Sequence, residues 1–228
     1  MPQKHKKVFV SSSGGKDTFL ALYKAGQNQD LKIACFLNMV SLDGKYSRTH
    51  GVGSGLLKLQ AQALGIPIIQ KKASWATYEE EFKKAVLDLK KEDIRTGVFG
   101  DIDLEEHRQW VERVCKELDI EPIFPLWQIK REDILGEFIS AGFKAVVVSV
   151  KASFLGKEWL GRKIDEEFVE QLSSLSNIDL CGEKGEYHSF VFDGPLFKKK
   201  VNILNTKKIK RDKYCFLEIL DYEIVKKI

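Results

Sequence analysis

The stretch Ser11-Ser12-Ser13-Gly14-Gly15-Lys16-Asp17-Thr18 decides the fold, because it joins the apolar run Val8 to Val10 to an amphipathic run that begins at Phe19. This pattern predicts a strand, a tight loop and a helix. Two adjacent glycines let the backbone approach a ligand closely, and the first amides of the helix point outward with the positive end of its dipole. We therefore expect the loop to bind an anion such as pyrophosphate, although an ordinary strand-to-helix turn can carry the same glycine pair.

The loop does not satisfy the Walker A pattern. That motif places a glycine five residues before its Gly-Lys pair and a serine or threonine directly after the pair. In this chain the two positions hold Val10 and Asp17. A nucleotide phosphate bound here would have to be held in a different way.

The composition is that of a globular protein with nearly balanced charge. The 228 residues are 43% hydrophobic, which is enough for a sizeable core, and 37 basic residues against 33 acidic ones give a net charge of +4. This excess does not demand nucleic-acid binding, and the lysine runs near both ends are expected to be solvated surface rather than a polyanion site. No run approaches the roughly 20 apolar residues that span a bilayer, so no membrane association is expected.

The cysteines favour a reduced, cytoplasmic setting. They are scattered without CxxC spacing, which argues against a zinc site and against a disulfide framework. The four are Cys35, Cys115, Cys181 and Cys215.

The first half alternates strands with helices. Helices are expected at 17–24, 56–64, 78–91 and 103–118, and strands, after the first one, at 32–40, 67–70, 96–100 and 122–124. This rhythm predicts an α/β fold with a doubly wound parallel sheet, in which ligands bind beyond the carboxyl ends of the strands. By this rule, the candidate ligand-binding segments are residues 11–18, 39–41 and 100–103, which follow the first, second and fourth strands.

The rhythm changes after residue 125. Helices are expected at 134–141 and 165–175, a β-branched strand at 145–150, and more alternating, antiparallel strands at 188–193, 201–204 and 215–225. We therefore predict two domains, at 1–125 and 126–228, the second a smaller α+β region.

Two segments of the second region carry unusual chemistry for loops. Trp159-Leu160-Gly161-Arg162, followed by Ile164-Asp165, brings together an aromatic ring, a guanidinium and a carboxylate. The run 181–188 (CGEKGEYH) sets two glutamates and a histidine among two glycines. Such groups can bind a cation or act as a base, but solvated glutamates on a polar hairpin and a tryptophan that anchors the packing would look the same.

Together these motifs resemble the diphthine-ammonia ligase family of the N-type ATP pyrophosphatases. Residues 13–18 match the SGGxD(S/T) pattern of the PP-loop, and WLGRxID and GE(K/N)GE(Y/F)H(S/T)FVxDxPLF occur near the end. Further similar stretches run through 59–67, 97–108 and 141–149. Thr18 replaces the serine of many members, and the segment 100–103 (GDID) is more acidic than expected for the family.

The resemblance implies a PP-loop domain of the adenine nucleotide alpha hydrolase-like type and a C-terminal substrate domain. It also implies the last step of diphthamide formation on elongation factor 2, in which ATP and ammonia convert the carboxylate of diphthine into an amide. ATP would transfer AMP to that carboxylate and release pyrophosphate, and ammonia would then attack the acyl-adenylate.

The resemblance assigns the nucleotide to the loop and the neighbouring strand ends. The expected ATP-binding residues are Ser11, Ser12, Ser13, Gly14, Gly15, Lys16, Asp17, Thr18, Met39, His50 and Gly100. Asp17 and Asp101 are the candidates for Mg²⁺, which prefers one or two carboxylates with phosphate and water. Asp17 could instead be only a favourable first-turn residue of the helix, and His50 only a local cap rather than an α-phosphate ligand.

The acceptor and ammonia are assigned to the second region. Glu183 and Glu186 are expected to bind ammonium and accept its proton, with His188 as an alternative base, so the catalytic set is Lys16, Asp17, Glu183, Glu186 and His188. The expected substrate-binding residues are Trp159, Gly161, Arg162, Asp165, Glu183 and Glu186. Trp159 is expected to stack on a cationic group, and the Arg162 guanidinium is expected to bind a carboxylate or phosphate through two hydrogen bonds.

Several alternatives stay open at this point. A PP-loop enzyme could act on another acceptor, either a tRNA base or a small carboxylate, or the chain could be a non-catalytic ATP- or AMP-binding module. ATP, ammonia and elongation factor 2 carrying diphthine are the expected partners, nucleic acid is not expected, and a homodimer is left open.

Overall fold

The computed structural model describes residues 5–227, which form two units by their internal contacts. The first unit comprises residues 5–13, 17–48 and 66–129, and the second comprises 14–16, 49–65 and 130–227. This division differs from the predicted single boundary after residue 125. Three loop residues and the segment 49–65 belong with the C-terminal region, and hydrogen bonds join Gly14, Lys16 and Gln60 to its strand β7 (Tyr187–Asp193).

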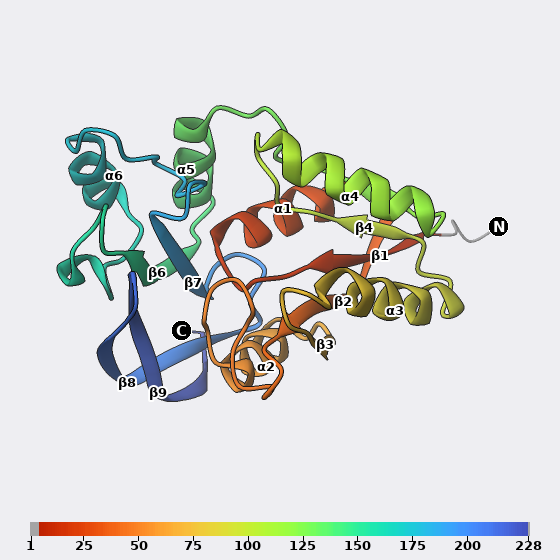
Figure 1. The fold of residues 1–228 in the computed structure, drawn as a ribbon, viewed down its shortest axis with the longest axis horizontal. Helices are drawn as coiled ribbons and strands as arrows, with labels where there is room; N and C mark the ends of the chain where they lie inside the picture. Colours follow the sequence, from red (N-terminus) through yellow and green to blue (C-terminus); the bar gives the residue numbers. More distant parts are fainter. Residues whose placement is uncertain (1–4, 228) are drawn as a thin grey trace. The chain divides into compact units, whose positions relative to one another are not determined.

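The first unit is built on a five-stranded parallel sheet in the order β3-β2-β1-β4-β5. Its strands are β1 (Lys6–Ser11), β2 (Leu31–Val40), β3 (Ile68–Lys72), β4 (Thr96–Val98) and β5 (Glu121–Ile123) (Figure 1). The chain moves outward in one direction from β1 through β2 and β3 and then returns to the other side of β1. The loop after β1 therefore lies at the switch point of the sheet, as the doubly wound prediction requires.

Helices cover both faces of this sheet. Alternate strand residues point to opposite sides, so that Phe9, Leu37 and Met39 pack in one core cluster with α3 (Tyr78–Lys91) and α4 (Glu105–Glu117). Phe36 instead meets Phe19 of α1 (Lys16–Gly26), with ring centroids 6.2 Å apart.

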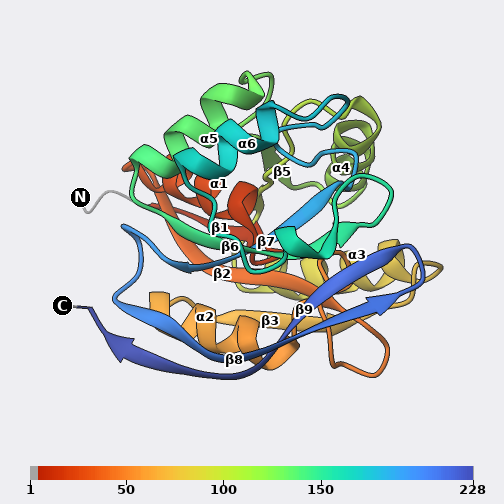
Figure 2. The same ribbon diagram turned by 90° about the vertical axis from the view of Figure 1, so that its left-hand side faces the viewer.

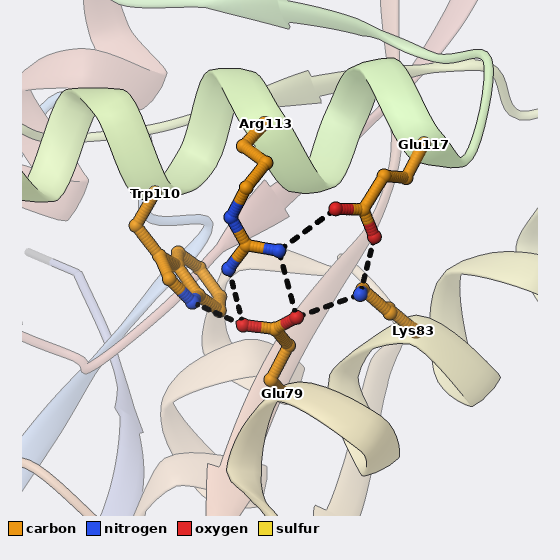
Figure 3. Close-up of polar contacts among 5 residues, drawn as sticks. All are labelled: Glu79, Lys83, Trp110, Arg113 and Glu117. Carbon is orange, nitrogen blue, oxygen red and sulfur yellow. Dashed lines mark hydrogen bonds and ion pairs between the residues drawn. The ribbon is translucent and has the colours of Figure 1, made fainter.

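A polar network links α3 to α4 on their outer surface (Figure 3). The Glu79 carboxylate accepts hydrogen bonds from the Arg113 guanidinium, from Lys83 Nζ and from the indole Nε1 of Trp110. Lys83 and Arg113 also pair with Glu117. We call these five residues the helix-pair network.

The second unit is built on a four-stranded antiparallel sheet in the order β7-β6-β9-β8 (Figure 2). Its strands are β6 (Lys144–Lys151), β7 (Tyr187–Asp193), β8 (Lys199–Arg211) and β9 (Tyr214–Lys226). Its helices are α2 (Ser54–Leu64), α5 (Arg131–Ser140), the 3₁₀ turn η1 (Lys157–Trp159) and α6 (Glu166–Ser173). This architecture confirms the predicted α+β character.

Strand β8 is much longer than the predicted 201–204. Its register runs from Lys199 opposite Lys226 to Arg211 opposite Tyr214, so the lysine-rich stretch after Leu204 is paired strand. That stretch lacks the apolar alternation that marks a half-buried strand, because most of its side chains are exposed on both faces.

Two further expectations concern thiols and membranes. The four cysteines are free and buried, and burial raises the pKa of Cys35 to about 11 and that of Cys115 to about 12. In the described part of the chain, no helix has the length and apolar character needed to cross a bilayer.

Candidate functional site

The beginning and end of the glycine loop are fixed within the first unit. The Ser12 amide donates to Leu37 O at 2.8 Å, and Nδ2 of the buried Asn38 donates to Ser12 O at 2.8 Å. The hydroxyls of Ser13 and Thr18 lie 3.3 Å apart, and the Ser13 amide donates to the Thr18 hydroxyl oxygen at 3.4 Å. Two hydroxyls thus meet where β1 ends and α1 begins.

Gly100 follows β4, beside the start of α1. A Cβ at this position would come within 2.9 Å of the carbonyl carbon of Asp17, so only glycine lets the two backbones pass this closely. The half-buried Asp101 comes next, with its Oδ1 3.6 Å from Nδ1 of His107. Asp17 and Asp101 therefore follow neighbouring strands of the parallel sheet.

The two carboxylates do not form a dedicated metal cage. Within residues 5–227, no group of three or more His, Cys, Asp and Glu side chains is placed to hold a metal ion. Mg²⁺ commonly uses only one or two carboxylates and takes its other ligands from phosphate and water. The donor set at Asp17 and Asp101 has the chemistry for that second kind of site.

Met39 lies near the end of β2, and its side chain is buried in the hydrophobic core with residues of α3 and α4. Its carbonyl accepts the Arg48 amide at 2.9 Å. Its contact with the nucleotide stays a prediction.

The middle of the loop, Gly14–Lys16, is bound to strand β7 in the second unit. The Val191 amide donates to Gly14 O at 3.0 Å, and the Lys16 amide donates to the Ser189 hydroxyl at 3.0 Å. Nε2 of the buried Gln60 on α2 donates to both Gly14 O and Val191 O, at 3.1 and 2.6 Å. These bonds join the two sequence motifs, because β7 begins inside the segment that starts at Cys181.

The Lys16 side chain is buried, with 3% of its surface exposed. Its Nζ donates to Cys181 O at 2.5 Å and lies 5.4 Å from the centroid of the Tyr187 ring. The Tyr187 hydroxyl in turn donates to Leu180 O at 2.6 Å. The ammonium is thus held against the loop before β7, and contact with a phosphate would require it to exchange the carbonyl for the ligand.

Two histidines stack beside this lysine. The rings of His50 and His188 have centroids 4.4 Å apart, and Nδ1 of His50 lies 3.3 Å from Ser189 O. A Cβ on Gly15 would come within 2.5 Å of His50 Cε1, so the second glycine of the loop is needed for this contact.

Burial favours the neutral form of both histidines. Burial lowers the pKa of His188 to about 4, with the Lys16 charge acting in the same direction. Burial, the His188 ring and Lys16 hold the pKa of His50 well below its ordinary value, against the opposing effect of its bond to Ser189. Neutral imidazoles accept hydrogen bonds, but a base with so low a pKa is a weak one.

The loop 177–187 is held by two buried carboxylates, which we call the loop brace. Asp179 accepts the amides of Cys181 and Glu183, at 2.8 and 2.9 Å, and pairs with Arg131 Nη1 at 2.6 Å. Glu186 is fully buried, and its two oxygens accept the amides of Asp179 and Lys184 at 3.2 and 3.0 Å. The brace fixes the carbonyl of Cys181 that receives Lys16.

The two glutamates of this loop therefore differ. Both oxygens of the Glu186 carboxylate are engaged with backbone amides inside the protein. Glu183 is half-buried, and its amide donates to Asp179 Oδ2 at 2.9 Å. Of the two residues, Glu183 is the more exposed.

The remaining predicted substrate residues lie around η1 and the start of α6. Trp159 is buried with its ring edge-on to Phe168, and the Arg162 guanidinium lies 4.6 Å from the indole centroid. Arg162 Nη1 donates to Gln171 Oε1 at 2.6 Å, and Asp165 caps α6 by accepting the Phe168 amide at 3.0 Å. Trp159 and Asp165 thus have structural contacts within this region, and their contact with a substrate stays a prediction.

Several residues of this site are not among those predicted from the sequence. Tyr187 and Ser189 lie in or beside the quoted motif and could have been found from it. Gln60 lies in the family-like stretch 59–67, but that stretch did not indicate its contact with the loop. Arg131 and Asp179 lie outside the quoted stretches, and only the tertiary contacts described above reveal their role.

Comparisons with known proteins cover nearly the whole chain. Family models for the diphthamide synthase N-terminal domain and C-terminal domain match residues 6–122 and 130–225. Human and bovine proteins named diphthine-ammonia ligase are 32% and 31% identical over 218 residues, which cover 86% of this chain and 82% of each relative. A Schizosaccharomyces pombe protein of the same name is 26% identical over 236 residues, covering 93% of this chain and 39% of its own length.

One solved structure is described as a predicted subunit of a tRNA methyltransferase from Methanocaldococcus jannaschii. It has a TM-score of 0.45 and 13% identity, covering 83% of this chain and 98% of that chain. This likeness carries no inference about the function of the chain.

Proposed function

Since the chain belongs to the diphthine-ammonia ligase family and is a ligase, we propose that it uses ATP and ammonia to amidate the carboxylate of diphthine on elongation factor 2. The observation that carries this proposal is the bonding of Gly14–Lys16 to β7. It joins the predicted phosphate loop to the segment that is most specific to the family.

The reaction has two steps. A carboxylate is a poor acyl donor, so its oxygen first attacks the α-phosphorus of ATP, and the bond to pyrophosphate breaks. Ammonia then attacks the acyl carbon, the bond to AMP breaks, and one proton is lost. The products are the amide, AMP and pyrophosphate.

The loop supplies the groups for the first step. The Ser13 and Thr18 hydroxyls, the amides that open α1 and the Lys16 ammonium oppose the charge that grows on the leaving phosphates. His50 lies beside Gly15 with His188 stacked on it, and neutral imidazoles there can hydrogen-bond a ligand without adding a second buried cation. Asp17 and Asp101 would hold Mg²⁺, which neutralises phosphate charge when it is bound.

The second step needs a base that can reach ammonium. We assign this role to Glu183, because it is the more exposed residue of the pair. Glu186 then acts as a positioning residue, since its oxygens already hold the backbone of the loop brace. His188 is a weaker candidate because of its low pKa.

The test follows α-labelled ATP with ammonium and diphthine-bearing elongation factor 2, with and without Mg²⁺. We expect AMP, pyrophosphate and amidated protein in equal amounts, each dependent on the acceptor. ADP and phosphate as products would overturn the adenylate, and ATP binding without turnover would indicate a nucleotide-binding module instead.

Variants separate the two steps. Lys16→Ala and Asp17→Ala should abolish AMP transfer, while Lys32→Ala, on the exposed surface of β2, serves as the matched control. Glu183→Gln should leave AMP transfer intact and slow amide formation by about 10²-fold or more. Amide formation at the normal rate in Glu183→Gln would remove Glu183 from the mechanism.

A further inference from the structure

Strand β8 has an open edge far from the glycine loop in sequence. It lies at the end of its sheet, and its register pairs it with β9 from Lys199 to Arg211 (Figure 2). From Leu204 to Arg211 every residue is exposed except the half-buried Ile209. The second backbone edge of this half of β8 can therefore accept another strand.

The same half of the hairpin is strongly basic. Its basic residues are Lys207, Lys208, Lys210, Arg211 and Lys213. Arg211 pairs with Glu218, and Lys208 donates to Lys157 O at 3.0 Å. Within residues 5–227, Lys207, Lys210 and Lys213 form no ion pair. Lysines on an edge strand can serve simply to prevent pairing with other chains.

Apolar features of the hairpin are not explained by that protective role. Leu204 and Leu220 expose 52% and 54% of their surface, and they lie where the register between β8 and β9 shifts. Leu204 also lines a pocket of about 390 Å³. Lysines alone are sufficient to prevent pairing at this edge. Exposed leucines and a pocket large enough for a side chain indicate a binding surface instead.

The pocket exists because β9 diverges from β6. The two strands pair only from Ser149 to Lys151, and the segment 161–164 takes the place of β9 along the rest of β6. The space is lined by apolar and polar side chains from β6, β7, β8 and β9. Among the lining residues are Val146, Phe192, Val201, Ile203, Leu204 and Leu217, with Lys200, Asn202 and Thr206 as polar members.

We propose that the distal half of β8, with this pocket, docks an extended acidic segment of the protein that carries the acceptor carboxylate. The segment adds a strand to the open edge, places one apolar side chain in the pocket, and sets its carboxylates against Lys207 and Lys210. The acidic character follows from charge complementarity with the unpaired lysines. The proposal rests on the proposed function for the identity of the partner.

The first test is a charge reversal at the hairpin. K207E/K210E should raise the KM for the acceptor protein by about tenfold or more at low salt, and leave kcat and the KM for ATP unchanged. K32E/K116E is the matched control, because it makes the same change in net charge at exposed lysines of β2 and α4. An unchanged acceptor KM in K207E/K210E would overturn the proposal.

A second measurement does not depend on turnover. Binding of the acceptor protein should slow hydrogen exchange of the amides in 204–211, and Leu204→Asp should abolish that protection. If the wild-type chain does not amidate the acceptor but still shows this protection, the proposed function fails and the docking surface stands. Protection absent in an active wild type overturns the docking surface alone.

Other occupants give different results. If K207E/K210E changes the oligomeric state in sedimentation, the edge pairs with a second copy of this chain. If it loses affinity for a single-stranded RNA oligonucleotide with an unchanged acceptor KM, the lysines bind nucleic acid. Either result overturns the proposal.

Discussion

The helix-pair network and the loop brace use the same kinds of residue in opposite surroundings. In the first, the Glu79 side chain is 34% exposed and accepts from Arg113, Lys83 and Trp110 (Figure 3). In the second, the Asp179 side chain is 1% exposed and accepts from Arg131 and two backbone amides. Each cluster ties together segments that are distant in sequence.

The difference shows why a count of ion pairs says little about their importance. Water and salt can replace the partners of an exposed carboxylate, so such a pair stabilises the fold only weakly. A buried carboxylate has no such substitute, and removal of one partner leaves the other uncompensated. We therefore expect the brace, which has fewer charges, to be the more sensitive of the two clusters.

Loss of the Asp179 carboxylate should have the largest effect. Asp179→Ala removes a buried acceptor from Arg131 and from the amides of Cys181 and Glu183, and should lower the free energy of unfolding by about 3–5 kcal/mol. Urea unfolding followed by circular dichroism measures this loss in the free energy of unfolding. Asp133→Ala, at a solvated position in the first turn of α5, is the control and should be nearly neutral.

The histidine pair should give an intermediate effect that depends on pH. The pKa of His188 is about 4 in the folded protein, below its usual value of 6.5, so the unfolded state binds more protons between these values. The contribution of neutral His188 to the free energy of unfolding is therefore fully present above pH 6.5 and is lost as the pH drops towards 4. Unfolding of His188→Asn should show a shallower loss across this window, and an unchanged slope would contradict the assignment.

The helix-pair network should show the smallest effect, in a different pH window. Arg113 and Lys83 hold the pKa of Glu79 well below its usual range, so its contribution is present above about pH 4.5 and lost at lower pH. Glu79→Ala should destabilise the protein several-fold less than Asp179→Ala, and the loss should shrink in 1 M salt. A salt-independent loss as large as that of Asp179→Ala would remove the distinction between the two clusters.

The sequence predicted the parallel sheet well because its helices are regular and amphipathic. The helix α3 has the bounds 78–91 that its apolar spacing predicted. The predicted length of β8 was wrong, because lysines exposed on both faces remove the alternation from which strands are identified.

The site could be predicted only where its residues belong to contiguous motifs. Asp165 looked like a ligand because a carboxylate followed Arg162, but a carboxylate before a helix is also a cap, and the structure shows that role. Arg131 lies 48 residues from its partner Asp179, so no local pattern could pair them. Site residues whose role depends on tertiary packing need the fold before they can be assigned.

The bonding of Gly14–Lys16 has a consequence for experiments that dissect the protein into fragments. A gene cut between the two matched segments, for instance after Ile129, would keep the glycines but remove their partners Ser189, Val191 and Cys181. The N-terminal piece expressed alone would carry the whole motif by sequence, without the contacts that give Lys16 its position. Failure of that piece to bind nucleotide would thus say nothing against the loop, and complementation with the C-terminal piece is the informative assay.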